Sequence, residues 1–345
     1  MKFDYCIGNP PYQENDGSGA SSDAAVPVYD DFITNMKAVS NKSISVIIPS
    51  KWMTGGRGLD KFRKEMMQDK HISALYDFEE SKDVFPNVHI DGGVCIFVRK
   101  TEYNGDTSYE YHSKDGHISK SVRSLSNDFF NFVIRDNRIL STLKKVNSDI
   151  KFSSIVSNVR PFGIRGYLFN EPDRYPDSNL SDVPFEDSVH VYGVKGIKGG
   201  AKRVDGYCSK AIVLNNVDMI NKYKLFFSKS YSTNAIEPPA RIIGKPNEIC
   251  TETFLAIGPF ANLYETENCE KYIQTNFFKV LLYNGKGTMN VTSSVFKLIP
   301  LQNFTSNSDI DWSQSISDID KQLYQKYNLS DDEINFIETY VKEMN

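Results

Sequence analysis

The segment FDYCIGNPPY, residues 3–12, joins a short apolar run to a turn that regular secondary structure cannot continue through. Pro10 and Pro11 lack the backbone N–H that a strand or a helix needs, so the strand must end at this point. Pro10 also restricts Asn9 to an extended backbone, which fixes the direction of the Asn9 amide. Open α/β sheets bind ligands at the carboxyl ends of their strands, so Tyr12 would lie beside a ligand site. An amide next to an aromatic ring suits a flat base with an exocyclic amine.

This turn contains the groups that would make such an amine reactive. An aromatic amine is a poor nucleophile because its lone pair is delocalised into the ring. If Asn9 Oδ1 and the Pro10 carbonyl accepted both amino hydrogens, the lone pair would become localised, and Tyr12 would stack on the base. Catalysis would then come from positioning and electrostatics, without a covalent intermediate. The alternative is a turn that only ends a strand, and its position directly after an apolar run favours the catalytic interpretation.

Residues 3–12 resemble the catalytic motif of DNA adenine-N6 methyltransferases, particularly the gamma class of type IIG restriction–modification enzymes. Further segments continue the resemblance: residues 43–53, 84–86, 93–98, 250–258 and 295–301. The resemblance implies S-adenosylmethionine as cofactor, double-stranded DNA as partner, and a target adenine flipped out of the duplex. It also implies a catalytic set with the following members: Asn9, Pro10, Pro11, Tyr12 and Phe85.

Two side chains in and after the segment 84–86 have competing interpretations. Phe85 could anchor the core, although the resemblance implies that it packs on the extruded base. His89 is interpreted as a loop histidine rather than a general base, because an amine that loses a proton after methylation needs no strong base. The glycine- and serine-rich residues 13–27 are interpreted as a flexible loop that closes over the site or contacts DNA.

Composition limits the class of protein. The chain has 345 residues, 40% of them hydrophobic, which is enough for two domains. Its 40 basic and 44 acidic residues give a net charge of −4, so a nucleic-acid surface must be local. The five cysteines form no Cys-x-x-Cys pair and no pattern with the histidines, which predicts no metal site and a reducing, cytoplasmic setting. No signal peptide and no membrane-spanning run is evident.

The first hundred residues predict part of a doubly wound sheet. Periodicity indicates helices over 28–39 and 59–69, and strands over 3–8, 44–48, 72–78 and 93–98. The cofactor-binding turn that the family carries after an earlier strand, Phe-x-Gly-x-Gly, is not found. Residues 193–200 are the only glycine-rich alternative, and their lysines suit phosphate better than a sulfonium donor. The predicted fold class is α/β, a partial doubly wound (Rossmann-like methyltransferase) sheet followed by a mixed α+β target-recognition domain.

Without a neighbour, strand 3–8 would present an unpaired edge and a bare apolar face. Another polypeptide completes this sheet, the chain is part of a longer one, or the chain self-associates through the same edge. We therefore predict a second chain carrying the cofactor-binding half, or self-association. The predicted domains are a catalytic half-domain over 1–150, a DNA target-recognition domain over 151–310 and an acidic helical tail over 311–345.

Residues 195–245 contain ten basic and three acidic residues, a net charge of +7, with tyrosines and phenylalanines between them. This composition is typical of a groove that follows a phosphate backbone, although a solvated charged surface over an ordinary core has the same composition. The candidate DNA contacts are Lys195, Lys198, Lys202, Arg203, Lys210, Lys222, Lys224 and Lys229. By contrast, residues 311–345 carry a net charge of −5 and predict a docking helix.

The function predicted from sequence is site-specific DNA adenine-N6 methylation within a restriction–modification system, with a cofactor-binding half supplied elsewhere. One alternative is a catalytically inactive DNA-specificity module. Another is an interaction protein that pairs with an upstream chain. No restriction-nuclease signature is evident, so cleavage of DNA is not predicted.

Overall fold

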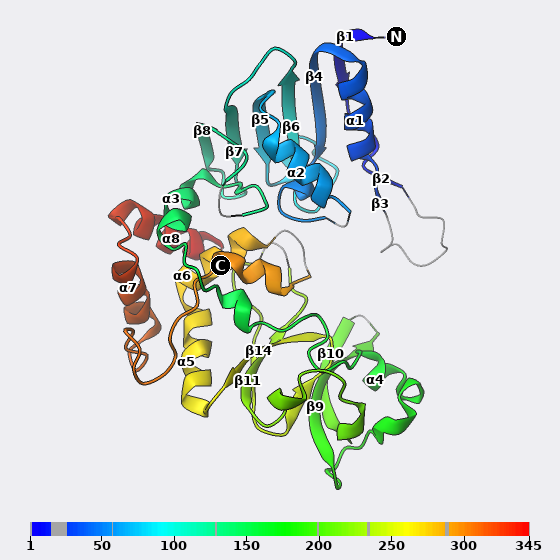
Figure 1. The fold of residues 1–345 in the computed structure, drawn as a ribbon, viewed down its shortest axis with the longest axis vertical. Helices are drawn as coiled ribbons and strands as arrows, with labels where there is room; N and C mark the ends of the chain where they lie inside the picture. The colour runs from blue at the N-terminus through cyan, green and yellow to red at the C-terminus, as the bar shows by residue number, and fades with distance from the viewer. Residues whose placement is uncertain are drawn as a thin grey trace. The chain divides into compact units, whose positions relative to one another are not determined.

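The computed structural model describes residues 2–14, 26–56, 58–127, 130–198, 200–232, 235–286 and 290–344 (Figure 1). Two compact units are present: Met1–Ser141 with Lys286–Thr288, and Thr142–Gly285 with Met289–Asn345. The division lies inside helix α3 (Leu140–Lys145), slightly before the boundary expected near residue 150. Most of the segment 13–27, for which the sequence suggested a closing or DNA-contacting loop, lies outside the described residues.

The first unit is built on a six-stranded sheet with the order β1-β4-β6-β5-β7-β8. Its strands are β1 (Phe3–Gly8), β4 (Ser40–Pro49), β5 (Ile72–Phe78), β6 (Val94–Lys100), β7 (Thr107–His112) and β8 (Ile118–Arg123). The parallel pairs are β1 with β4 and β5 with β7, and the other neighbours are antiparallel. A short ribbon joins β2 (Gln13–Glu14) to β3 (Val26–Pro27). The α/β class is confirmed, but the sheet is mixed because β6 runs antiparallel between β4 and β5.

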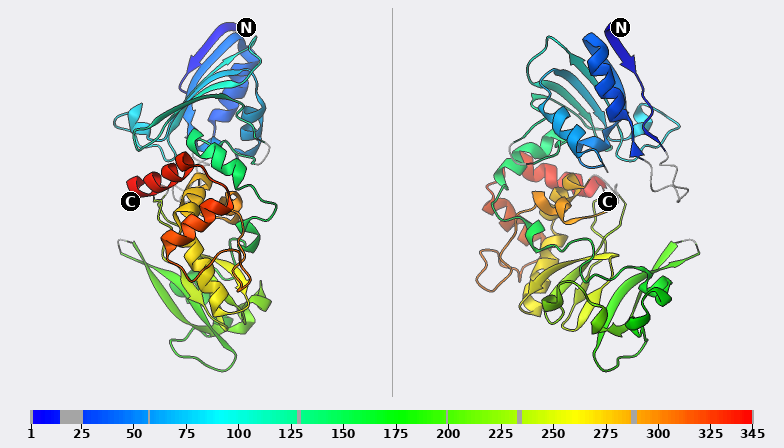
Figure 2. Two further views of the ribbon diagram at one scale, coloured as in Figure 1. Left: turned by 90° about the vertical axis from the view of Figure 1, so that its left-hand side faces the viewer. Right: turned by 45° about the vertical axis from the view of Figure 1, so that its right-hand side comes forward.

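Helices α1 (Tyr29–Val39) and α2 (Asp60–Gln68) lie on one face of this sheet (Figure 1 and Figure 2). The alternation of β4 buries Ile44, Val46 and Ile48 on that face, where they join Ile33 of α1 and Met66 of α2 in one apolar core. Burial of these side chains is the main stabilising term for the unit.

The other face of the sheet is poorly covered near β1. Within the described ranges β1 pairs on one side only, with β4. Its side chains Phe3, Tyr5 and Ile7 are 47%, 66% and 83% exposed, and Tyr76 on β5 is 40% exposed. An exposed apolar strand edge of this kind favours pairing with another strand.

The second unit contains two three-stranded sheets, with helices before and after them along the chain. The first sheet has the order β10-β9-β13, and the second has the order β12-β11-β14. Their strands are β9 (Ser188–Ile197), β10 (Gly200–Ser209), β11 (Tyr223–Ser228), β12 (Ile242–Gly244), β13 (Glu248–Cys250) and β14 (Phe254–Phe260). The helices are α4 (Tyr167–Asn170), α5 (Leu263–Gln274), α6 (Asn276–Gly285), α7 (Ile316–Lys326) and α8 (Asp331–Met344).

The acidic C-terminal segment is part of this second unit rather than a separate body. Asp320 on α7 is buried, and its two carboxylate oxygens accept the backbone N–H groups of Asn276 and Phe277 at 2.9 Å each. These are N–H groups at the start of α6, which a negative charge stabilises. The segment 311–345 therefore completes the packing of the helices.

Candidate functional site

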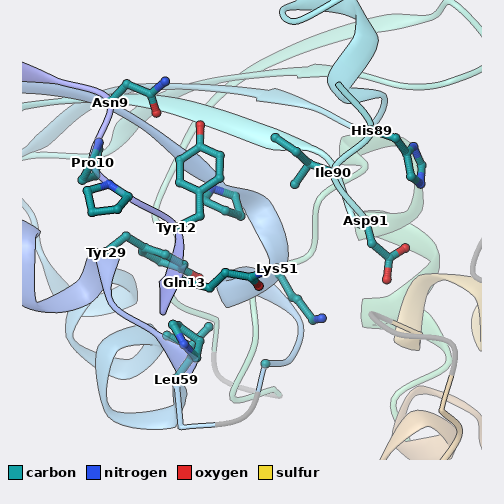
Figure 3. A pocket seen from close by; sticks show the side chains of 14 residues that line it. Asn9, Pro10, Tyr12, Gln13, Tyr29, Lys51, Leu59, His89, Ile90 and Asp91 are labelled. Atoms are coloured by element: carbon teal, nitrogen blue, oxygen red, sulfur yellow. The ribbon is translucent and has the colours of Figure 1, made fainter. Parts of the chain in front are cut away.

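A cavity of about 580 Å3 lies in the first unit, at the edge where the parallel strands β1 and β4 end. It is lined by Asn9, Pro10, Pro11, Tyr12, Gln13, Pro27, Tyr29, Pro49, Lys51, Gly56, Leu59, His89, Ile90 and Asp91 (Figure 3). Carboxyl ends of neighbouring strands are where α/β sheets place their ligands. The structure therefore brings the motif that ends β1 into the wall of a pocket.

Four of the five predicted catalytic residues line this pocket: Asn9, Pro10, Pro11 and Tyr12. Pro10 is buried, whereas Asn9 is exposed. The Asn9 side chain lies next to the hydroxyl end of Tyr12 (Figure 3). An exposed amide beside an aromatic ring matches the arrangement expected for binding a flat base with an amine.

Phe85 is not among the residues that line the pocket, so the structure does not bring it to the other four. It is half-buried in the loop after the short helix η3 (Ser81–Asp83). Its backbone N–H donates to the Ser81 carbonyl at 2.8 Å, and its carbonyl accepts from the Val88 N–H at 3.0 Å. Those turns direct the end of the loop, rather than Phe85, towards the cavity. The loop contributes His89, Ile90 and Asp91 to the wall.

The hydroxyls of Tyr12 and Tyr29 are buried and make no hydrogen bond within the described part of the chain. Burial raises the pKa of Tyr12, while the nearby Asn9 side chain lowers it by a smaller amount. Burial also raises the pKa of Tyr29, which is 2% exposed. Both hydroxyls are therefore protonated and able to donate to a ligand. The sequence did not single out Tyr29, which is simply the first residue of a predicted helix.

A buried ionic network lies beneath the pocket wall. The carboxylate of Asp77 near the end of β5 is fully buried and accepts hydrogen bonds from Ser50 Oγ at 2.6 Å and Tyr109 OH at 2.9 Å. Nε and Nη2 of Arg135 also donate hydrogen bonds to this carboxylate, each at 2.7 Å. This fork geometry is the strong form of a carboxylate–guanidinium pair.

The same network fixes the loop that carries His89 and Asp91. Arg135 Nη1 donates to the Gly92 carbonyl at 2.9 Å, and the Ser50 N–H donates to the Gly93 carbonyl at 3.0 Å. Gly93 has a φ of +80°, and a Cβ at that position would lie 2.0 Å from the Phe78 carbonyl oxygen. Only glycine fits there, so the loop returns to β6 along one defined path.

The predicted DNA contacts do not form one surface. Lys195, Lys198, Lys202 and Arg203 are exposed together at the end of the β9–β10 ribbon, where Lys195 lies directly opposite Lys202. Lys210 and Lys222 are exposed on other segments, and Lys229 is half-buried. The described part of the glycine-rich stretch, residues 193–198 and 200, lies in and beside this ribbon and forms no strand–turn–helix phosphate site.

Lys224 is a correction to the sequence-based set. It is 0% exposed, and its Nζ donates to the carbonyls of Met219, Ile220, Lys222 and Lys245 at 2.7–3.1 Å. Burial lowers the pKa of Lys224 to about 8. A lysine held inside the fold by four carbonyls cannot contact DNA, and its role is structural.

The described residues do not form a complete site for S-adenosylmethionine. A nucleotide-like cofactor needs a glycine-rich turn at a strand end and a carboxylate for its ribose. Within the described ranges of the first unit, the glycines before α2, Gly55, Gly56 and Gly58, do not follow a strand directly, because the short helix η2 (Ser50–Met53) separates them from β4. No described strand lies on the free side of β1. No group of three or more His, Cys, Asp or Glu side chains in the described part could hold a metal ion. No helix there is long and apolar enough to cross a membrane.

Parts of this chain are similar to known proteins. Residues 1–85 match the model of the Eco57I restriction-modification methylase family. An uncharacterized adenine-specific methylase of Mycoplasma pneumoniae (strain ATCC 29342 / M129 / Subtype 1) is 33% identical over 155 residues, which are 44% of this chain and 36% of that protein. The chain therefore matches little more than a third of the relative's length.

A solved structure shares the fold over nearly the whole chain. The type IIL restriction–modification enzyme MmeI, solved in complex with DNA, has a TM-score of 0.50 and 10% identity over 99% of this chain and 57% of its own. At 10% identity this likeness concerns the fold alone. The family match over residues 1–85 and the Mycoplasma relative support the resemblance to adenine-specific methylases of restriction–modification systems. The gamma class and the type IIG kind stay predictions.

Proposed function

We propose that this chain carries the base-binding and DNA-recognition parts of a DNA adenine-N6 methyltransferase of a restriction–modification system, of the gamma class and type IIG kind. The single observation that carries the proposal is the pocket at the end of β1, where Asn9, Pro10 and Tyr12 meet inside a segment that matches a methylase family.

The chemistry follows from these three residues. The target adenine is flipped out of the duplex, because its amine cannot be reached within the base stack. Asn9 Oδ1 and the Pro10 carbonyl accept the two amino hydrogens, which localises the lone pair on the nitrogen. Tyr12 stacks on the base and holds the amine in one direction. The rate gain comes from orientation and from fixed hydrogen-bond acceptors.

S-adenosylmethionine would supply the methyl group when bound, chiefly on strands that add to β1. The support is the open edge of β1 and the exposed Tyr5 and Ile7 beside it. The added strands belong either to another part of a longer polypeptide or to a second chain, and self-association through β1 is the competing outcome. All five cysteines are free thiols, which supports a reducing, cytoplasmic setting.

The β9–β10 ribbon is the proposed DNA contact. Lys195 and Lys202 are cross-strand neighbours, and like charges placed directly opposite each other destabilise a sheet. A polyanion removes that repulsion, and a two-stranded ribbon fits the major groove of DNA. The ribbon is anchored by Asn170, which binds the Val194 carbonyl at 3.2 Å and the Gly196 N–H at 2.8 Å.

A second candidate is a DNA-specificity or interaction module without methyltransferase activity. The observation that favours it is the incomplete cofactor site on the described residues. The two candidates differ in whether a chain completing the sheet restores methyl transfer.

The test uses the chain together with its cofactor-binding half, duplex DNA and S-adenosylmethionine carrying a radioactive methyl group. Asn9→Ala should lower methyl transfer by about a hundredfold or more, because a fixed acceptor at the reacting centre is lost. DNA affinity should stay within a few-fold of the wild type. Asn104→Ala changes an exposed asparagine outside the pocket and is the matched control. Normal transfer by the Asn9→Ala variant would contradict the proposal.

A further inference from the structure

Buried polar atoms without partners are concentrated at the pocket. Five such side-chain oxygens occur among the described residues, and they belong to Tyr12, Tyr29, Asp30, Thr142 and Asn247. Two of the five line the pocket, and Asp30 follows Tyr29 in α1. A buried hydroxyl without a partner lowers stability, so one that a protein retains calls for a partner such as a ligand or an ordered water.

Tyr29 is held so that its hydroxyl cannot turn to solvent. The side chain is 2% exposed, and its ring packs edge-on against Phe62 with centroids 5.8 Å apart. In the close view, Tyr12 stands between Asn9 on one side and Tyr29, Gln13 and Lys51 on the other (Figure 3). The pocket therefore has two polar ends, with the stacking ring between them.

The second end also carries a positive charge. Lys51 belongs to the short helix η2 (Ser50–Met53) directly after β4, is half-buried and lines the pocket. Throughout the described ranges no carboxylate lies within 4.0 Å of its Nζ. A tyrosine donor and an ammonium group without a carboxylate partner among the described residues together suit an anionic oxygen, of which phosphate is the usual case in nucleotides.

This combination extends the proposed function and rests on it. With the amine of the base held at Asn9 and Pro10, the sugar–phosphate of the same nucleotide lies towards the opposite end of the pocket. We propose that Tyr29 donates a hydrogen bond to a sugar–phosphate oxygen of the extruded nucleotide, and that Lys51 neutralises its phosphate. Tyr29 and Lys51 thereby position the base for the groups that act on its amine.

The experiment titrates the full chain with adenine and with deoxyadenosine 5′-monophosphate, followed by ligand-observed NMR. The wild type should bind the monophosphate more tightly than the free base. Tyr29→Phe should weaken monophosphate binding about three- to tenfold and leave adenine binding unchanged, as expected for one hydrogen bond. Lys51→Met should remove most of the preference for the monophosphate. Lys61→Met, at an exposed lysine of α2, is the matched control and should change neither affinity.

Thermal unfolding provides an independent readout. Because the Tyr29 hydroxyl has no hydrogen-bond partner among the described residues, Tyr29→Phe should not lower the melting temperature. Tyr109→Phe removes a buried hydroxyl that does have a partner, Asp77, and should lower it. A purely structural role for the Tyr29 hydroxyl would instead make the two variants behave alike.

The outcomes separate this inference from the function on which it rests. If Asn9→Ala weakens adenine binding but Tyr29→Phe and Lys51→Met leave the monophosphate affinity intact, the inference fails and the base pocket stands. A melting temperature that falls as far for Tyr29→Phe as for Tyr109→Phe also overturns it. If the wild type binds neither ligand, or Asn9→Ala changes nothing, the proposed base pocket fails, and the inference fails with it.

Discussion

Arg135→Met is the sharpest test of how the pocket wall is held. Arg135 is paired with a carboxylate, Asp77, that is 0% exposed, through two contacts of 2.7 Å. The methionine fills most of the space and removes the charge. Among the described residues, Asp77 would keep the hydroxyls of Ser50 and Tyr109 as its hydrogen-bond partners.

The magnitude follows from that geometry. Removing one partner of a buried ion pair leaves an uncompensated charge and typically costs about 3–5 kcal/mol of the free energy of unfolding. The double variant Asp77→Asn with Arg135→Met has no stranded charge, so it should recover about 1 kcal/mol or more relative to Arg135→Met alone. The hydrogen bond from Arg135 to the Gly92 carbonyl is lost in both variants.

Amide hydrogen exchange, read by mass spectrometry over β5, β6 and residues 85–93, measures the first unit separately from the second. Arg99→Met is the matched control, because its partner Asp69 keeps Lys37 at 2.9 Å. We expect a large loss of protection for Arg135→Met and a small one for Arg99→Met. A loss below about 1 kcal/mol for Arg135→Met, or equal losses in both variants, would refute the reasoning.

Three further predictions concern the second unit. Burial raises the pKa of Asp320 to about 6 from 3.8, so the folded chain binds the Asp320 proton more tightly than the unfolded chain does. The free energy of unfolding therefore falls as the pH rises. This loss is absent below pH 3.8 and reaches about 3 kcal/mol above pH 6. In urea unfolding, the Asp320→Asn variant should lack this fall in the free energy of unfolding between pH 4 and 7. The same pH dependence in the variant and the wild type would contradict the prediction. Lys195→Gln and Lys202→Gln should each reduce the slope of log affinity for duplex DNA against log salt concentration by about 1. A DNA affinity that does not change with salt would contradict the assignment of this ribbon as the DNA contact. Lys224→Met should leave that slope unchanged but lower the melting temperature, because four carbonyls lose their hydrogen bonds to the buried ammonium group. The reverse pattern would place Lys224 on the surface.

Local patterns in the sequence were sufficient to predict several helices and strands of the first unit. The strand predicted over 72–78 is β5 with the same bounds, and the helices predicted over 28–39 and 59–69 are α1 and α2 within a residue or two. Alternation and helical periodicity are local properties, and two consecutive prolines end a strand in any context. The same reasoning placed Asn9 and Tyr12 at a strand end, where the pocket lies.

Long-range pairing and burial could not be predicted in this way. The sequence of β6 does not predict that this strand runs antiparallel between β4 and β5, because the direction of pairing depends on which strands lie beside it. A lysine inside a basic stretch looks the same whether it faces solvent or, like Lys224, donates to carbonyls that only the folded chain brings together. The resemblance predicted that Phe85 packs on the extruded base, but the turns of its own loop decide where its side chain lies. Tyr29 became a candidate only when its hydroxyl was found buried without a partner.

The measurement closest to the central claim is the identity of the methylated base. DNA is incubated with S-adenosylmethionine and the chain together with its cofactor-binding half, digested to nucleosides and separated by mass spectrometry. We expect N6-methyldeoxyadenosine with the wild type and its loss with Asn9→Ala, because in the proposed function Asn9, which lines the pocket with Pro10 and Tyr12, accepts a hydrogen bond from the amino group of adenine. A methylated cytosine, or N6-methyldeoxyadenosine at wild-type amounts from the Asn9→Ala variant, would contradict the account.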